Sequence, residues 1–249
     1  MEGYGGITLD GAFAEYMIAD ARESSKVPDR VSFETAAPLA CAGVTVWRGV
    51  LQVDLKAGET VALVGAGGGL GHLGYRFARA LGLQVIGIDA RDEGLELAKA
   101  SGANIVIDAR QGKIKLLKKF RKSPTAWELT PPSNVSDNVE AVALACAVTK
   151  MHGTMVQIAQ PDLVSLPYPE LIFRDVRVNG SLISSRSEAQ RMLHVVAEHN
   201  ITVQTNPFFG LKEIPRLVEL AQSGKMAGKG VVVIKEKEIE KLRAGKVRP

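Results

Sequence analysis

The sequence predicts an α/β protein built on a doubly wound parallel sheet of the Rossmann type. Three observations lead to this prediction. Strand and helix signals alternate between residues 60 and 183, a glycine-rich loop follows the first strand, and an acidic residue ends the second. The chain has 249 residues, of which 46% are hydrophobic and 23% charged, so it can bury a sizeable core.

The first βαβ unit begins with the apolar run 60–64, which is followed by the glycine cluster 65–71. A short apolar run that ends in glycines is typical of a buried parallel strand. Residues 72–81 have helical character and stop at Gly82, a common residue just beyond a helix end. The run 84–89 then predicts the second strand.

The same alternation continues to residue 183. It predicts helices at 93–101, 113–122 and 139–151, and strands at 103–108, 154–159 and 176–183. The remaining strand position contains Pro131 and Pro132, which lack the amide proton that a central strand donates. Either that strand is confined to a few residues near Asn134 and Val135, or the segment is a loop.

The two ends of the chain differ from this central part. Before residue 45, several glycines and the run 13–18 predict a turn and a strand. Beyond residue 183 we expect a helix at 187–199, an extended piece at 201–208, a helix at 212–223 and a strand at 230–234. We therefore divide the chain into residues 1–45, a nucleotide-binding domain over 46–183, and a carboxy-terminal part over 184–249.

Composition and charge argue against several classes of protein. The net charge is only +4, and aromatic residues make up 5% of the chain. The basic run 113–122 is therefore interpreted as a solvated helix face and not as a nucleic-acid contact. No apolar run reaches the ~18 residues of a membrane span, and the amino terminus does not resemble a secretory signal. With Cys41 and Cys146 as the only cysteines, we expect a cytoplasmic protein without nucleic-acid or membrane partners.

The glycine-rich loop is the strongest functional motif. It reads Gly-Ala-Gly-Gly-Gly-Leu-Gly from Gly65 to Gly71 and lies between a strand and a helix. Without side chains in the way, backbone amides and the helix amino terminus can bind a pyrophosphate. The alternative is a tight structural turn. The candidate cofactor-binding residues of the loop are Gly65, Gly67, Gly68, Gly69, Leu70 and Gly71.

An acidic residue stands at the matching place on the second strand. Asp89 lies 18 positions after Gly71, where a carboxylate can accept hydrogen bonds from the adenosine ribose 2′-hydroxyl. This favours NAD over NADP, since a 2′-phosphate would meet a like charge. Arg91, two residues later, leaves NADP open, and a plain turn residue is the alternative for Asp89.

Three segments together resemble the medium-chain, zinc-dependent alcohol dehydrogenases, most closely the fungal and bacterial tetrameric type. They are Ala37-Pro-Leu-Ala-Cys-Ala-Gly-Val-Thr-Val-Trp47, the stretch 61–89, and Met226-Ala-Gly-Lys-Gly-Val-Val-Val-Ile234. The resemblance implies an NAD-dependent oxidoreductase that converts an alcohol to an aldehyde or ketone. It also implies that residues 1–45 and 184–249 are remnants of a GroES-like catalytic domain.

The resemblance implies a set of site residues as well. Cys41 would be a ligand of the catalytic zinc, and Thr45 would lie against the nicotinamide ring as a catalytic residue. A basic residue at Lys229 would reach the pyrophosphate. The residues expected beside the nicotinamide are Ile158, Ser181 and Ile183.

The family's other two zinc ligands and its proton-relay residue belong to an amino-terminal segment of about a hundred residues, the size of a small domain, which this sequence lacks. Without those ligands, Cys41 is equally well a buried, unreactive cysteine. We therefore expect a homo-oligomer that binds NAD and whose action on a small alcohol or aldehyde is impaired. Two alternatives stay open: a zinc-free oxidoreductase like the quinone reductases, and a non-catalytic NAD-binding module that oligomerises through the strand 176–183.

Overall fold

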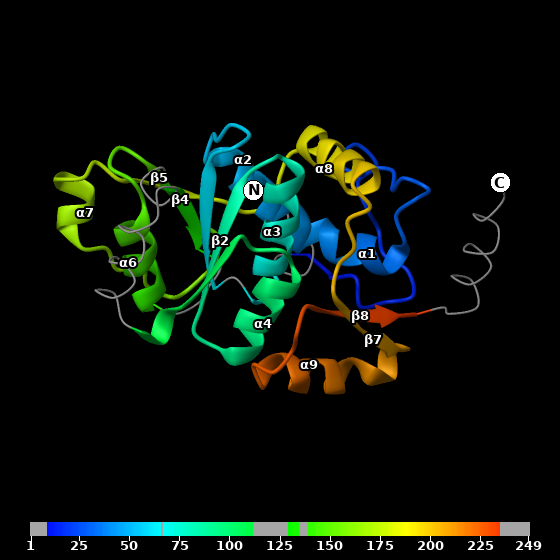
Figure 1. Cartoon of the computed structure of the whole chain (residues 1–249). Coiled ribbons are helices and arrows are strands. Elements are labelled where there is room, and N and C mark those ends of the chain that lie inside the picture. Colours follow the sequence, from blue (N-terminus) through cyan, green and yellow to red (C-terminus); the bar gives the residue numbers. More distant parts are fainter. Residues whose placement is uncertain (1–8, 66, 112–128, 135–138, 235–249) are drawn as a thin grey trace. The chain divides into compact units, whose positions relative to one another are not determined.

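The computed structural model describes residues 9–65, 67–111, 129–134 and 139–234 (Figure 1). The chain forms two compact units, one over residues 39–184 and one from residues 1–38 and 185–249. The first boundary falls seven residues before the predicted 45/46, because the helix that follows Gly43 packs against the larger unit.

The larger unit contains a parallel sheet of six strands in the order β3-β2-β1-β4-β5-β6. This order places β1 and β4 at the centre, where the chain reverses its winding direction, and it confirms the predicted Rossmann-type fold. The strands are β1 (Thr60–Val64), β2 (Gln84–Asp89), β3 (Ile105–Asp108), β4 (Leu129–Asn134), β5 (Thr154–Gln157) and β6 (Arg177–Gly180).

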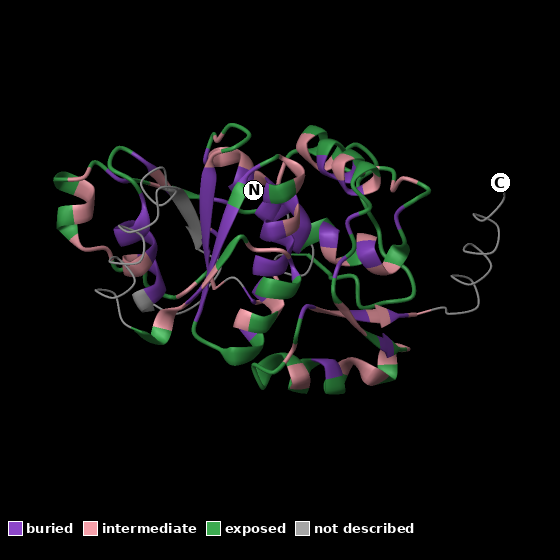
Figure 2. Cartoon of the chain, in the orientation of Figure 1, coloured by how far each residue is buried: buried purple, intermediate pink, exposed green. Residues whose placement is uncertain are grey.

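Helices cover this sheet, and its central strand β1 is buried. All five residues of β1 are buried, which explains why the sequence shows an apolar run there and no alternation (Figure 2). The helix after the glycine loop packs on β1 and β2. The helical segments of this unit are η1 (Leu39–Gly43), α2 (Val44–Gln52), α3 (Gly71–Ala80), α4 (Asp92–Ala100), η2 (Ala109–Gln111), α6 (Val139–Val148) and α7 (Tyr168–Ile172).

The fourth strand corrects one prediction. β4 runs through Pro131 and Pro132 and lies between β1 and β5, where the sequence predicted a shortened strand or a loop. Its register with β1 shifts between Val61 and Leu63, and the prolines fall at this irregularity. Because the regular ladder is broken there, the missing amide protons are tolerated. The helix predicted at 113–122 lies outside the described residues.

The smaller unit has a two-stranded parallel sheet of β7 (Thr205–Phe209) and β8 (Lys229–Val233). α1 (Phe33–Pro38) packs on both strands, and η4 (Leu211–Glu213) leads into α9 (Ile214–Gln222). α8 (Arg186–Glu198) begins with a capping box. In it, the Ser185 hydroxyl accepts a hydrogen bond from the Glu188 amide, and the Glu188 carboxylate accepts one from the Ser185 amide.

The amino-terminal region departs from the prediction. The run 13–18 forms no strand, and its side chains are exposed, with Ile18 fully so. A strand needs neighbouring backbone to satisfy its amides and carbonyls, and none of the described strands pairs with this run. The sequence analysis also missed the helical segments between Phe33 and Gln52. In the described part of the chain, no helix has both the length and the apolar character needed to cross a bilayer.

Candidate functional site

The glycine loop turns sharply between β1 and α3. Gly65 has φ +73°, a left-handed conformation that suits glycine, and its amide donates a hydrogen bond to the Ile88 carbonyl of β2 at 2.9 Å. The Gly68 carbonyl accepts from the His72 amide at 3.3 Å and so starts α3. The loop is thereby fixed to the carboxyl ends of two neighbouring strands, at the amino terminus of a ten-residue helix.

Two glycines allow the loop to approach α4. A Cβ atom on Gly67 would lie 1.9 Å from the Gly94 Cα atom, and a Cβ on Gly94 would lie 2.4 Å from the Cγ atom of Asp89. Any side chain at either position would therefore separate the loop, α4 and the carboxylate. The sequence analysis predicted a role for Gly67 but missed Gly94, for which a glycine in the first turn of a predicted helix was the only signal.

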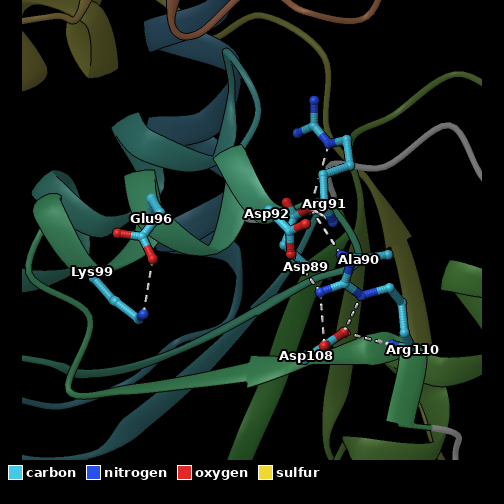
Figure 3. Close-up of polar contacts among 8 residues, drawn as sticks. All are labelled: Asp89, Ala90, Arg91, Asp92, Glu96, Lys99, Asp108 and Arg110. Atoms are coloured by element: carbon cyan, nitrogen blue, oxygen red, sulfur yellow. Dashed lines mark hydrogen bonds and ion pairs between the residues drawn. The ribbon is translucent and has the colours of Figure 1, made fainter.

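The Asp89 side chain is held firmly at the end of β2 (Figure 3). It is only 3% exposed. Its Oδ2 atom accepts a hydrogen bond from the Gly67 amide at 2.8 Å. Its Oδ1 atom accepts hydrogen bonds from the Ala90 and Arg91 amides, both at 2.9 Å. The Arg91 guanidinium is also near, with Nε 3.4 Å from Oδ1. The carboxylate is thus oriented by the backbone of the glycine loop and of its own turn.

These residues fit the adenosine and pyrophosphate part of a dinucleotide. The loop offers backbone amides and a helix amino terminus, both of which bind phosphate. At Gly68 a Cβ atom would meet nothing nearer than the Gly65 carbonyl at 3.5 Å, so the loop is open there. A carboxylate accepts about four hydrogen bonds in all, and Oδ2 of Asp89 receives one from the described residues. Oδ2 therefore has a second lone pair to offer a hydroxyl.

A second group of predicted residues meets at the amino-terminal end of α2. The Thr45 hydroxyl donates to the Cys41 carbonyl at 2.8 Å and accepts from the Ile183 amide at 3.0 Å. The Ser181 hydroxyl donates to the Thr45 carbonyl at 3.1 Å. Ile183 has φ +54°, an uncommon conformation for a β-branched residue, and in it the amide points at Thr45. Residues far apart in the sequence are thereby joined after β6.

Leu70 and Ile158 connect the loop with the end of β5. Leu70 packs against a buried cluster that contains Ile158. Ile158 is 4% exposed and sits so close to α2 that a Cβ atom on Gly49 would lie 2.6 Å from its Cδ1 atom. Lys229 begins β8 in the other compact unit, where its amide donates to the Gln204 carbonyl at 2.8 Å.

Cys41 is an exposed free thiol in η1, which corrects the alternative that it is buried. Cys146, in α6, is buried. Within the part of the chain that the structure describes, no three His, Cys, Asp or Glu side chains are grouped to hold a metal ion. A catalytic zinc takes three protein ligands, so the described residues do not fit one.

The Tyr75 side chain of α3 packs against β2, close to Asp89. A Cβ atom on Gly87 would lie 1.9 Å from the Tyr75 Oη atom, so the tyrosine ring fits there only because residue 87 of β2 is a glycine. Burial raises the pKa of Tyr75, and the negative charge of Asp89 raises it further. This hydroxyl therefore stays protonated at neutral pH and is not a proton acceptor.

Comparison with known proteins agrees with this geometry. Residues 69–198, just over half of the chain, match the family described as zinc-binding dehydrogenase. Alcohol dehydrogenase 1 of Emericella nidulans is 30% identical over 93% of this chain and 66% of its own length. An alcohol dehydrogenase of Geobacillus stearothermophilus is 32% identical over 93% of this chain and 67% of its own.

Solved structures give the same result. The alcohol dehydrogenase from the archaeon Aeropyrum pernix superposes with a TM-score of 0.82 at 27% identity, covering 93% of this chain and 67% of that one. The chain therefore spans about two thirds of the length of the relatives it matches, and slightly less of the Emericella nidulans protein.

Proposed function

The chain belongs to the zinc-binding dehydrogenase family, and we propose that it carries the NAD(H)-binding part of an NAD-dependent alcohol dehydrogenase. One observation carries the proposal: the Asp89 carboxylate is held 2.8 Å from the Gly67 amide, between the glycine loop and the end of β2. This places an acceptor for ribose hydroxyls beside amides that can bind a pyrophosphate.

In this proposal the two groups of site residues bind opposite ends of the cofactor. The glycine loop and the α3 amino terminus hold the pyrophosphate, and Asp89 accepts hydrogen bonds from the adenosine ribose. Thr45, Ser181 and Ile183 face the nicotinamide, and the role of Lys229 stays a prediction from the family resemblance. NAD is favoured over NADP because a 2′-phosphate would approach the buried carboxylate of Asp89.

Bound NAD would supply the hydride acceptor for oxidation of a small alcohol to an aldehyde or ketone. The protein's own part is to bind, orient and shield that cofactor. Thr45 is buried and held by two hydrogen bonds of its hydroxyl, so it would form a fixed wall beside the nicotinamide. Zinc assistance would need ligands besides Cys41, and the described residues lack such a cluster. We therefore expect the 249-residue chain to bind NADH and to oxidise alcohols poorly or not at all.

We further propose that the chain forms a homo-oligomer through the edge of its sheet. Among the described strands, β6 is at the edge of the sheet and pairs on one side only, with β5. Beside it along the chain, the α7 segment exposes apolar side chains: Tyr168 is 67% exposed, and Ile172 and Phe173 are 70% exposed. Apolar side chains next to an unpaired strand favour association.

The second candidate is an NAD-binding module without turnover, which is favoured because the described residues hold no metal-binding cluster. One experiment separates the two. The purified chain is titrated with NADH by fluorescence, and its zinc content and its NAD reduction with ethanol are then measured with and without a chelator. Binding without turnover supports the module, and chelator-sensitive turnover supports the zinc enzyme. Chelator-insensitive turnover supports the zinc-free alternative. Absence of NADH binding refutes the proposed function.

A matched pair of variants shows whether binding uses the proposed site. Asp89→Asn removes the charge that accepts the ribose hydroxyls and should weaken NADH binding about tenfold. Glu96→Gln removes an equal charge from the exposed side of α4, where Glu96 pairs with Lys99 at 3.0 Å, and should leave binding unchanged. Equal effects of the two substitutions would place NADH elsewhere.

A further inference from the structure

Arg110 joins two carboxylates at the end of β3 (Figure 3). Its Nε atom donates to Asp108 Oδ1 at 2.9 Å and its Nη2 atom donates to Asp108 Oδ2 at 2.9 Å. The same Nη2 atom donates to Asp92 Oδ1 at 2.6 Å. A single guanidinium therefore connects the end of β3 with the first residue of α4. No local pattern in the sequence predicts this cluster.

The cluster lies beside the carboxylate that the proposed function assigns to the ribose. In the parallel pairing of β2 and β3, Asp89 is the direct partner of Asp108. Asp92 follows Asp89 by three residues, at the start of α4. Figure 3 shows the Arg110 guanidinium between Asp108 and the turn that contains Asp89 and Ala90. Its positive charge is thus at the adenosine end of the site.

Among the described residues, two arginines lie at this edge, and each contacts a carboxylate. Arg91 lies against Asp89, and Arg110 is shared by Asp92 and Asp108. These hydrogen bonds raise the pKa of Arg110 further above its ordinary value. Such exposed ion pairs add little to folding stability. These ion pairs instead determine whether a ligand at this edge meets a positive or a negative group.

We propose that Asp92 and Asp108 hold Arg110 away from the ligand and so make this edge selective for NAD(H) over NADP(H). The inference rests on the proposed function and extends it from Asp89 to a second ionic element. A 2′-phosphate is the ligand that a free arginine at this edge would bind, because the guanidinium fork matches a phosphate group. While both carboxylates hold the Arg110 guanidinium, its fork is turned to them and not to a 2′-phosphate.

The test measures dissociation constants for NADH and NADPH by fluorescence titration of the full chain. Asp92→Asn weakens the hold on Arg110, and Asp92 is 78% exposed, so the fold should tolerate the change. We expect the preference for NADH over NADPH to fall about tenfold, as one charge-assisted hydrogen bond to the 2′-phosphate would produce.

Two further variants are measured in the same way as controls. Glu96→Gln makes the same change of net charge on the same helix and should leave the preference within about twofold of the wild type. The double variant Asp92→Asn with Arg110→Met should restore the preference, since the arginine that binds the phosphate is gone. Thermal unfolding of each protein shows that it is folded.

Each other result overturns the inference. An unchanged preference in Asp92→Asn, or an equal loss of affinity for both cofactors, means that the carboxylate only supports the fold of this edge. An equal shift in Glu96→Gln means that net charge alone is responsible. A loss that persists without Arg110 means that another cation binds the phosphate. Failure of the wild type to bind NADH refutes the proposed function itself, and the inference with it.

Discussion

Replacing Gly94 with alanine tests how closely the proposed ribose-binding carboxylate is held against α4. The new Cβ atom would lie 2.4 Å from Oδ1 and 2.7 Å from Oδ2 of Asp89. Comfortable contact between such atoms begins at about 3.5 Å, so the carboxylate or the helix must move by about 1 Å. The Asp89 side chain cannot turn aside freely, because three backbone amides hold it.

The size of the effect follows from hydrogen-bond lengths. The bond from the Gly67 amide to Asp89 Oδ2 measures 2.8 Å, and a shift of about 1 Å takes it beyond hydrogen-bonding range. The same shift removes the acceptor for a ribose hydroxyl. One hydrogen bond to a charged group is worth about 1.5–3 kcal/mol, which corresponds to a loss of NADH affinity of about 10- to 100-fold. Folding stability should change less, because alanine favours the helix by about 1 kcal/mol over glycine.

The assay is fluorescence titration with NADH beside thermal unfolding of each protein. Lys99→Ala is the control, since it changes an exposed side chain of the same helix. If Gly94→Ala binds NADH within twofold of the wild type, then the close approach of loop, helix and carboxylate is not needed for binding. In that case, the proposed place of the ribose is wrong.

Three further predictions concern the rest of the larger unit. Arg174→Ala should destabilise the protein by about 2 kcal/mol in urea unfolding, because its guanidinium binds three carbonyls at the end of α6. Tyr75→Phe should leave stability unchanged or raise it, because this buried hydroxyl lacks a hydrogen-bond partner among the described residues; clear destabilisation would reveal a hidden partner. A hydrogen bond from His152 lowers the pKa of Asp175. This pair therefore stabilises the folded protein at pH values above the ordinary aspartate pKa, and the stabilisation is lost as the pH falls through the lowered pKa. In an NMR titration, His152→Ala should return that pKa toward its usual range.

The local pattern of the sequence predicts the first half of the sheet well. The unit from β1 to β2 follows from a buried apolar run, a glycine loop and a helix that ends at Gly82, all of which are short-range signals. Asp89 could be placed for the same reason, because it is the last residue of a recognisable strand. The family resemblance brought Thr45, Ser181 and Ile183 to one place, and the structure joins them by hydrogen bonds.

Features that depend on distant neighbours could not be predicted. The prolines of β4 argue against a strand until the break in the register with β1 is known. The run 13–18 has the composition of a strand but lacks a partner among the described strands. The pairing of Arg110 with Asp92 joins two elements across 18 residues, and no periodicity in a single segment reports it. Such side-chain pairs are set by the sheet order and not by local preference.

The two prolines of β4 have a consequence for how the sheet opens. In most Rossmann-type sheets the central strands have complete ladders and exchange their amide protons last. Here two adjacent central positions carry no amide proton, and of the described β4 residues only Ser133 and Asn134 pair with β5. The sheet is therefore weakest at β4, which lies between the strands β3-β2-β1 and the strands β5-β6. A dinucleotide lying across the carboxyl ends of these strands would hold the two halves together, so NADH should slow hydrogen exchange in β1 and β5 at once.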